Sequence, residues 1–179
     1  MTLQDIVTQA LHRLKRSSDS QNLQKYQPEF LFSVNEGVKL IAARYHQSRK
    51  DTVALTSGVF TKTLLSRKAY EIIDVLAADK SVTFSEEYAG SGTYEVDTDE
   101  TSVAVIYRFV PAELSNSIDE PEIPEEFHGM LVNYVVANER ANGDPSLQSA
   151  AKTDFDLFYS KLNNIVPCDI PTVLTGYFT

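Results

Sequence analysis

The sequence predicts an α+β fold: a four-helix bundle with an inserted small antiparallel β-sheet or sandwich and an extended C-terminal tail. Apolar residues recur at the helical period near both ends of the chain, and short β-rich runs fill its middle. Prolines interrupt the apolar stretch that follows the last helical pattern. We therefore divide the chain into N-terminal helices (1–50), a β-rich insertion (51–112), a C-terminal helical hairpin (113–165) and an extended docking tail (166–179).

Residues 1–50 are expected to form two helices. Thr2 and Asp5 have capping-box spacing, so the first helix is expected to run from there to about Lys15. Positive charge in its last turn then offsets the negative end of the helix dipole. After the polar linker SSDSQNLQK, Pro28 is expected to be the first residue of the second helix. Gly37 inside that helix predicts a close crossing with another helix.

The middle segment, residues 51–112, has the pattern of short antiparallel strands. Residues rich in Val, Ile, Thr, Tyr and Phe alternate with turn signals at 57–58, 79–80, 90–92 and 97–99. The clearest strand signal is the alternation of Val103, Val105, Tyr107 and Phe109, which indicates a face that is partly buried.

Residues 113–165 are expected to form two antiparallel helices joined by a minimal turn. Glu125 and Glu126 follow Pro124 in the first turn, where carboxylates interact favourably with the positive end of a helix. Gly143 is expected to end this helix at the C′ position, and Asp144 to cap the next one. The two helices are predicted to pack through apolar stripes that include Leu131, Tyr134, Phe155 and Phe158.

The tail, residues 166–179, is too rich in proline for a helix and too apolar for an ordinary disordered end. It is predicted to be a partner-docking element, although it could instead fold back on its own bundle. The docking residues are Cys168, Ile170, Pro171, Val173, Leu174, Tyr177 and Phe178.

Composition indicates the compartment in which the protein works. The single cysteine excludes an internal disulfide and fits a reducing compartment. No apolar run is long enough to span a bilayer, so a soluble intracellular origin is expected.

Charge is distributed unevenly along the chain. Residues 1–68 carry 11 Lys/Arg and 5 Asp/Glu, whereas residues 69–179 carry 5 Lys/Arg and 20 Asp/Glu. Such asymmetry suits a subunit that meets copies of itself through opposite faces, or it reflects surface drift alone. The net charge of −9 disfavours tight binding to duplex DNA.

No motif indicates catalysis, a metal or a cofactor. The three histidines are scattered, without zinc-site spacing, and are expected to be solvated on the surface. The sequence contains no nucleophile elbow and no phosphate-binding glycine loop, and no basic residue lies near Cys168 to activate its thiol. We therefore expect no enzymatic activity and no cofactor.

Three stretches together resemble the head-to-tail adaptor, or connector, proteins of tailed bacteriophages. They are the strand ending VIYRFVPAEL, the segment DEPEIPEEFHGMLVNYVVANERANGD, and the helix containing SAAKTDFDLFYSKLNNI. They are similar to that family's strand, Pro-Glu-Glu helix, Gly-Asp turn and final helix. The likeness extends more loosely to the N-terminal helix and the β-rich insertion.

The resemblance implies a structural virion protein without enzymatic activity. Such a subunit forms a ring, commonly of about twelve copies, at the head–tail junction of the virion, after assembly in the host cytoplasm. Its partners would be itself, the portal protein, and tail or tail-completion proteins. The ring would also line the channel for double-stranded DNA without binding the duplex tightly, and no membrane is involved. Family members often grip the portal with terminal segments, and here residues 168–179 are the candidate.

Two alternatives remain open from the sequence. A nucleic-acid-binding module would use the β-rich insertion as a stacking platform with Tyr88, Tyr94 and Tyr107, although acidic neighbours oppose this. The other alternative is a small enzyme of unrecognised type, which would require a pocket with convergent polar groups.

Overall fold

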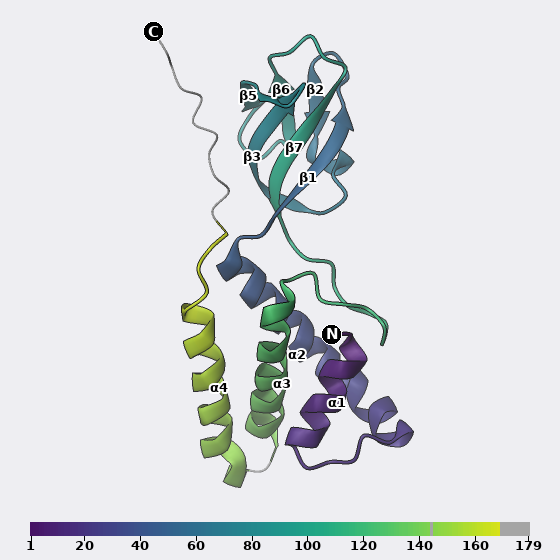
Figure 1. Ribbon diagram of the computed structural model, residues 1–179, viewed down its shortest axis with the longest axis vertical. Coiled ribbons are helices and arrows are strands. Elements are labelled where there is room, and N and C mark those ends of the chain that lie inside the picture. The colour runs from purple at the N-terminus through teal and green to yellow at the C-terminus, as the bar shows by residue number, and fades with distance from the viewer. Residues whose placement is uncertain (144, 169–179) are drawn as a thin grey trace. The chain divides into compact units, whose positions relative to one another are not determined.

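The computed structural model describes residues 1–143 and 145–168, which form two compact units (Figure 1). The helical unit comprises Met1–Tyr45 and Val110–Val166, and the β unit comprises His46–Phe109 together with Pro167 and Cys168. Each unit has its own hydrophobic core. Among the described residues, no helix combines the length and the apolar character needed to cross a membrane.

Helix α1 (Leu3–Arg13) begins as the sequence predicts. The Thr2 side chain accepts a hydrogen bond from the backbone N–H of Asp5, and the Asp5 carboxylate accepts one from the backbone N–H of Thr2. This reciprocal pair satisfies two of the free backbone donors at the start of the helix. The capping-box prediction is therefore confirmed, and the helix ends two residues earlier than expected.

Helix α2 (Ser20–Tyr45) corrects the prediction about Pro28, which lies inside the helix and not at its first position. The helix begins after Asp19, whose carboxylate accepts a hydrogen bond from the backbone N–H of Asn22. An internal proline removes one helical hydrogen bond and costs about 3 kcal/mol. Packing of Leu23 and Tyr26 against the core offsets this cost, because it stabilises the turns before the proline.

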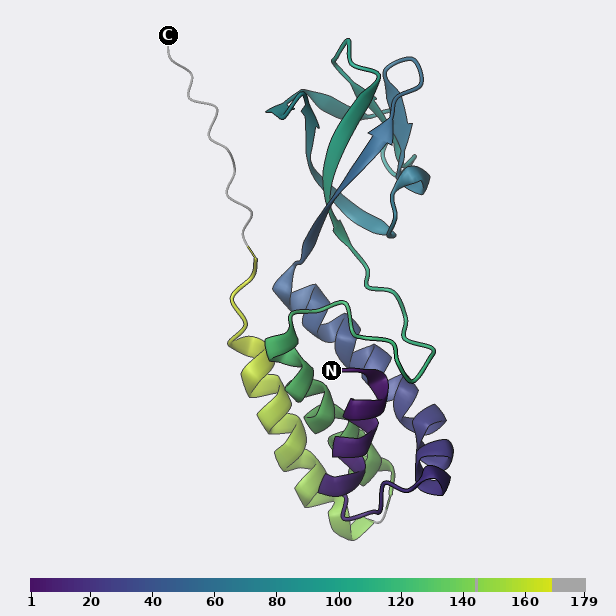
Figure 2. The ribbon, with the colours of Figure 1, turned by 45° about the vertical axis from the view of Figure 1, so that its right-hand side comes forward.

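Helices α3 (His128–Asn142) and α4 (Gln148–Asn163) form the predicted antiparallel hairpin, side by side in both views (Figure 1, Figure 2). The rings of Tyr134 and Phe158 lie 4.7 Å apart, and those of Tyr134 and Phe155 lie 5.9 Å apart. Short 3₁₀ turns, Glu125–Phe127 and Pro145–Leu147, precede the two helices. The predicted packing of this hairpin is confirmed.

The prediction of a single four-helix bundle with one inserted sheet is wrong. Seven strands separate α1 and α2 from α3 and α4 in the chain, and these strands form two small antiparallel sheets. Helix α3 packs against each of the other three helices, whereas α1 and α4 lie on different sides of it (Figure 1). The arrangement is therefore centred on α3 and is not the four-cornered arrangement of a bundle.

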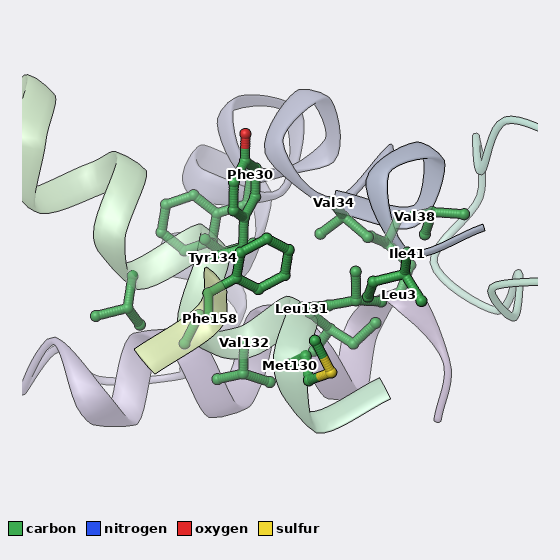
Figure 3. Packing of buried hydrophobic residues seen from close by; sticks show 14 of the residues in the cluster. Leu3, Phe30, Val34, Val38, Ile41, Met130, Leu131, Val132, Tyr134 and Phe158 are labelled. Carbon is green, nitrogen blue, oxygen red and sulfur yellow. The ribbon is translucent and has the colours of Figure 1, made fainter. Parts of the chain in front are cut away.

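The apolar character of α3 explains its central place. Its buried positions occur nearly all around the helix, unlike the single stripe expected for a helix on the surface of a bundle. Figure 3 shows four of these side chains, Met130, Leu131, Val132 and Tyr134, among residues from α1, α2 and α4. The close crossing predicted at Gly37 is also confirmed, because a Cβ atom there would lie 3.0 Å from Cδ2 of Leu131.

The β unit contains two antiparallel sheets that share one core. The four-stranded sheet has the order β1-β7-β3-β4, with β1 Ser48–Ala54, β3 Ala69–Ala77, β4 Lys80–Ser81 and β7 Ser102–Phe109. The three-stranded sheet has the order β2-β6-β5, with β2 Val59–Thr61, β5 Phe84–Glu86 and β6 Thr93–Val96. The alternation predicted for β7 is confirmed, because its residues 103, 105, 107 and 109 are all buried.

The turns of the β unit differ in part from the predicted hairpins. Ser57 and Gly58 form a tight turn with positive φ angles of 54° and 78°, but it joins strands of different sheets. The turn between β3 and β4 uses Ala78 and Asp79, one residue earlier than predicted. The turn signals therefore locate the reversals, whereas the choice of strand partners depends on packing across the core.

Asp51 on β1 ties a loop to the four-stranded sheet. Its carboxylate accepts hydrogen bonds from the backbone N–H of Ser66 at 2.7 Å and from the hydroxyl of Tyr107 at 2.5 Å. Burial by itself raises the pKa of Asp51, but these bonds and those from the Ser66 and Arg49 side chains outweigh it and lower the pKa from 3.8 to about 2. The ionised carboxylate is thus part of the native structure.

We expect Asp51→Asn to destabilise the β unit in a pH-dependent way. The folded pKa lies below the unfolded one, so the stabilisation is present above about pH 4 and is lost as the pH falls towards 2. Urea unfolding is expected to show a loss of up to about 2 kcal/mol at pH 7 and little loss at pH 2. Glu87→Gln, on an exposed side chain of the β unit, is the control. Equal losses for Asp51→Asn at both pH values would contradict this role.

Candidate functional site

The predicted docking tail lies almost entirely outside the described residues. Cys168 is described: it is half-buried and forms no disulfide. The remaining docking residues lie outside the described part of the chain: Ile170, Pro171, Val173, Leu174, Tyr177 and Phe178. Their docking role therefore stays a prediction.

The predicted helix-end residues lie where the helical hairpin starts and turns. Glu125 and Glu126 are exposed in the 3₁₀ turn that leads into α3. Gly143 directly follows the last residue of α3, and a Cβ atom there would lie 3.0 Å from the carbonyl oxygen of Glu139. Gly143 does not adopt the left-handed conformation, since its φ is −90°, so it is the close approach that favours glycine. Asp144 lies outside the described residues.

The basic end of α1 has a role that the sequence did not reveal. The Arg13 guanidinium donates a hydrogen bond to the buried side-chain oxygen of Asn133 on α3. Arg16 forms a 2.7 Å ion pair with Glu139 on α3, and its guanidinium also lies 4.5 Å from the centre of the Tyr26 ring. These side chains join α1 to α2 and α3. A polar asparagine within the apolar run MLVNYVVA was the one sequence signal for this contact.

His128 corrects the prediction that the histidines are solvated at the surface. It is buried at the start of α3, and its Nε2 lies 3.0 Å from the carbonyl oxygen of Ile123, to which it donates. This bond fixes the segment that leads into α3. Within residues 1–143 and 145–168, no three His, Cys, Asp or Glu side chains are grouped in a way that could hold a metal ion.

The three tyrosines of the alternative stacking platform do not share an exposed face. Tyr94 and Tyr107 are buried in the core of the β unit, and Tyr88 alone is exposed. Tyr94 stacks instead on Phe60, with ring centres 5.2 Å apart. These rings stabilise the fold of the β unit and are not available for stacking on bases.

Large apolar side chains are exposed on the outer surface of the helical unit. Phe32 on α2 is 74% exposed, and Leu157 on α4 is 46% exposed. Each lies on the side of its helix opposite the buried stripe. Ile118 and Val166, in the segments outside the helices, are 77% and 78% exposed. Side chains of this kind gain free energy when a partner covers them.

A hollow in the helical unit has a volume of about 670 Å³. It lies at the start of α3 and the ends of α1, α2 and α4, and its lining includes Arg13, Tyr45, Phe127, Lys161 and Val166. It is a wide, open depression that combines apolar side chains with two cations and the carboxylate of Glu126. This geometry favours contact with another chain over enclosure of a small substrate.

Comparison with models of known protein families finds no match, and comparison with curated proteins finds none either.

Proposed function

We propose that this chain is a structural virion protein: a subunit of the ring that joins the portal vertex of a tailed-bacteriophage capsid to the tail. In this role, copies of the chain associate with one another, with the portal protein and with tail or tail-completion proteins. The ring surrounds the passing double-stranded DNA without binding it tightly. The protein works by contact and positioning and carries out no reaction.

The observation that carries this proposal is the exposure of large apolar side chains on both α2 and α4. Phe32 and Leu157 lie on outer helix faces of a unit whose core is already complete without them. Scattered exposed apolar residues are common on monomers, but exposure of about three quarters of a phenylalanine is costly in water. Partner subunits would remove both side chains from solvent.

The specific identity of the assembly rests on the resemblance of the α3–α4 segment to the adaptor family. The helical hairpin provides a rigid scaffold for the contacts of such an assembly, because the ring of Tyr134 on α3 packs against those of Phe155 and Phe158 on α4. The ion pair between Arg140 and Asp154, at 2.5 Å, adds a second link near the turn. A rigid hairpin holds interface residues in place at little entropic cost on assembly.

Depletion of the chain during infection tests the proposal. If it is the adaptor, cells are expected to accumulate heads and tails that do not join, and wild-type chain supplied from a plasmid is expected to restore infectious particles. A chain truncated after Cys168 loses most of the predicted docking tail but keeps the whole helical unit. It therefore tests docking by the tail separately from folding. Joined, infectious particles in the absence of the chain would contradict the proposal.

A further inference from the structure

We propose that the β unit joins neighbouring copies head to tail, with the acidic loop of one copy, residues 97–101, seated in a basic hollow of the next. This inference rests on the proposed ring and names the surfaces that build it. The hollow is formed by the loop between β2 and β3. Both surfaces belong to the same compact unit, so their separation is known within one copy.

The basic hollow has a volume of about 440 Å³ and is open to solvent. Three cationic side chains and two hydroxyl side chains line it, and none of its lining residues is acidic. The polar lining residues are Lys62, Thr63, Ser66, Arg67 and Lys68. The ammonium and guanidinium groups of this lining are suited to carboxylates. The two hydroxyls form internal hydrogen bonds, Thr63 with Thr61 at 2.6 Å and Ser66 with Tyr107 at 3.4 Å.

The loop around the hollow is already held in place before any partner binds. The backbone N–H of Ser66 donates to Asp51, and the backbone N–H of Lys62 donates to the carbonyl oxygen of Gly92 at 2.8 Å. Asp51 is occupied by these internal bonds, and Glu86, near Lys62, accepts from the backbone N–H of Gly92. Neither carboxylate is among the residues that line the hollow, although Glu86 interacts electrostatically with Lys62. A fixed loop loses little entropy on binding.

The acidic loop presents three exposed carboxylates, from Asp97, Asp99 and Glu100. None of them forms an ion pair with any described residue. Backbone hydrogen bonds hold the loop at both ends: the N–H of Asp97 donates to Thr83, and that of Leu55 donates to Thr101. Three like charges on a fixed loop repel one another, and a cationic partner relieves this repulsion.

The acidic loop and the basic hollow lie at opposite ends of strand β7. The loop leads directly into Ser102 at the start of β7, whereas Ala69 at the edge of the hollow pairs with Phe109 at its end. Eight strand residues at about 3.3 Å each separate the two ends by roughly 26 Å. A contact between the acidic loop of one copy and the hollow of the next joins two different surfaces, so it is heterologous. Repetition of such a contact closes into a ring if the rotation between successive copies brings the last copy back to the first.

A second copy fits the hollow better than DNA does. Residues 46–109 of the β unit include 10 acidic and 7 basic residues, so a DNA duplex that approaches the hollow meets the net negative charge of the same unit. At physiological salt the screening length is about 8 Å, so only groups in direct contact attract strongly. A short acidic loop can place its carboxylates in the hollow without bringing a long array of phosphates near the other acidic residues.

Charge exchange on the full chain tests this contact. Sedimentation velocity at about 0.01 M salt, where screening extends to about 30 Å, is expected to show self-association of the wild-type chain. Lys68→Glu and Glu100→Lys are each expected to weaken it by about tenfold or more, because each places like charges in contact. A mixture of the two variants is expected to recover association to within about twofold of wild type, because Glu at 68 meets Lys at 100.

The matched control is Lys152→Glu, the same change on an exposed lysine of α4 in the helical unit. Lys152 belongs to neither the acidic loop nor the lining of the hollow, so this variant is expected to associate like wild type. Unchanged association of the two exchange variants, or no recovery in the mixture, would overturn the contact and leave the ring itself standing. The ring itself would be overturned if the wild-type chain sediments as a monomer and the head–tail junction contains no ring of it. If the Lys68→Glu change abolishes binding of a short DNA duplex and leaves self-association unchanged, the hollow is a DNA site.

Discussion

Phe158→Ala is expected to lower the free energy of unfolding of the helical unit by about 3–5 kcal/mol. Phe158 has no exposed surface and lies beside Tyr134 (Figure 3), with the two ring centres 4.7 Å apart. The centre of the Tyr159 ring lies 5.3 Å from that of Phe158. Truncation to alanine removes these contacts and leaves a cavity between α3 and α4. The loss is smaller within this range if neighbouring side chains move to fill the cavity, and larger if they do not.

The neighbouring residue supplies the control for this substitution. Leu157→Ala changes the same helix but removes a side chain that is 46% exposed, so we expect a loss below about 1 kcal/mol. Urea unfolding followed by the helical circular dichroism signal measures both variants. Similar losses for the two would show that α4 does not pack on α3 in the way described.

Gly37→Val is expected to cost about 1–3 kcal/mol, because it overfills the crossing of α2 and α3. The new Cβ atom would lie 3.0 Å from Cδ2 of Leu131 and 3.3 Å from Cδ1 of Tyr134. Both side chains are buried and have little room to move. The clash outweighs the improvement of a few tenths of a kcal/mol that valine brings over glycine in a helix.

Gly129→Val is the matched control for the crossing. Gly129 lies in α3, yet a Cβ atom there would meet no atom within 4 Å apart from its chain neighbours and the backbone of its own helix. The same substitution should therefore leave the free energy of unfolding unchanged or raise it slightly. A crossing that tolerates Gly37→Val as well as Gly129→Val would mean that the two helices are farther apart in solution.

Features that depend on near neighbours in the chain could be predicted from the sequence. The capping box of Thr2 and Asp5 involves two residues three positions apart. The alternation in β7 reports a face buried by its own strand geometry. The antiparallel α3–α4 hairpin follows from two apolar helices and a connection too short to allow another arrangement.

Features that depend on distant partners could not be predicted. Pro28 has a local preference for a helix start, but packing of Tyr26 on Phe30 and Arg16 extends α2 beyond it. The sequence shows that α3 is apolar, but not that three other helices surround it. The roles of Arg13 and His128 likewise depend on Asn133 and on the carbonyl oxygen of Ile123, which the local sequence does not identify as partners.

The candidate interaction surfaces also combine features that could be predicted from the sequence with features that could not. The charge asymmetry between residues 1–68 and 69–179 is visible in the sequence. The placement of Lys68 and Glu100 near opposite ends of β7 depends on the pairing register of β1, β3 and β7. The helical period of Phe30, Val34 and their neighbours leaves Phe32 outside the apolar face, but the sequence alone does not show that no other segment covers it.

The decisive measurement for the proposed function is electron cryo-microscopy of the head–tail junction in tailed-phage particles assembled in the presence of this chain. We predict a ring of copies of this chain directly beneath the portal, with the helical unit and the β unit each fitting the density as separate bodies. Copies of the chain elsewhere in the particle, or a junction built without it, would contradict the proposed function.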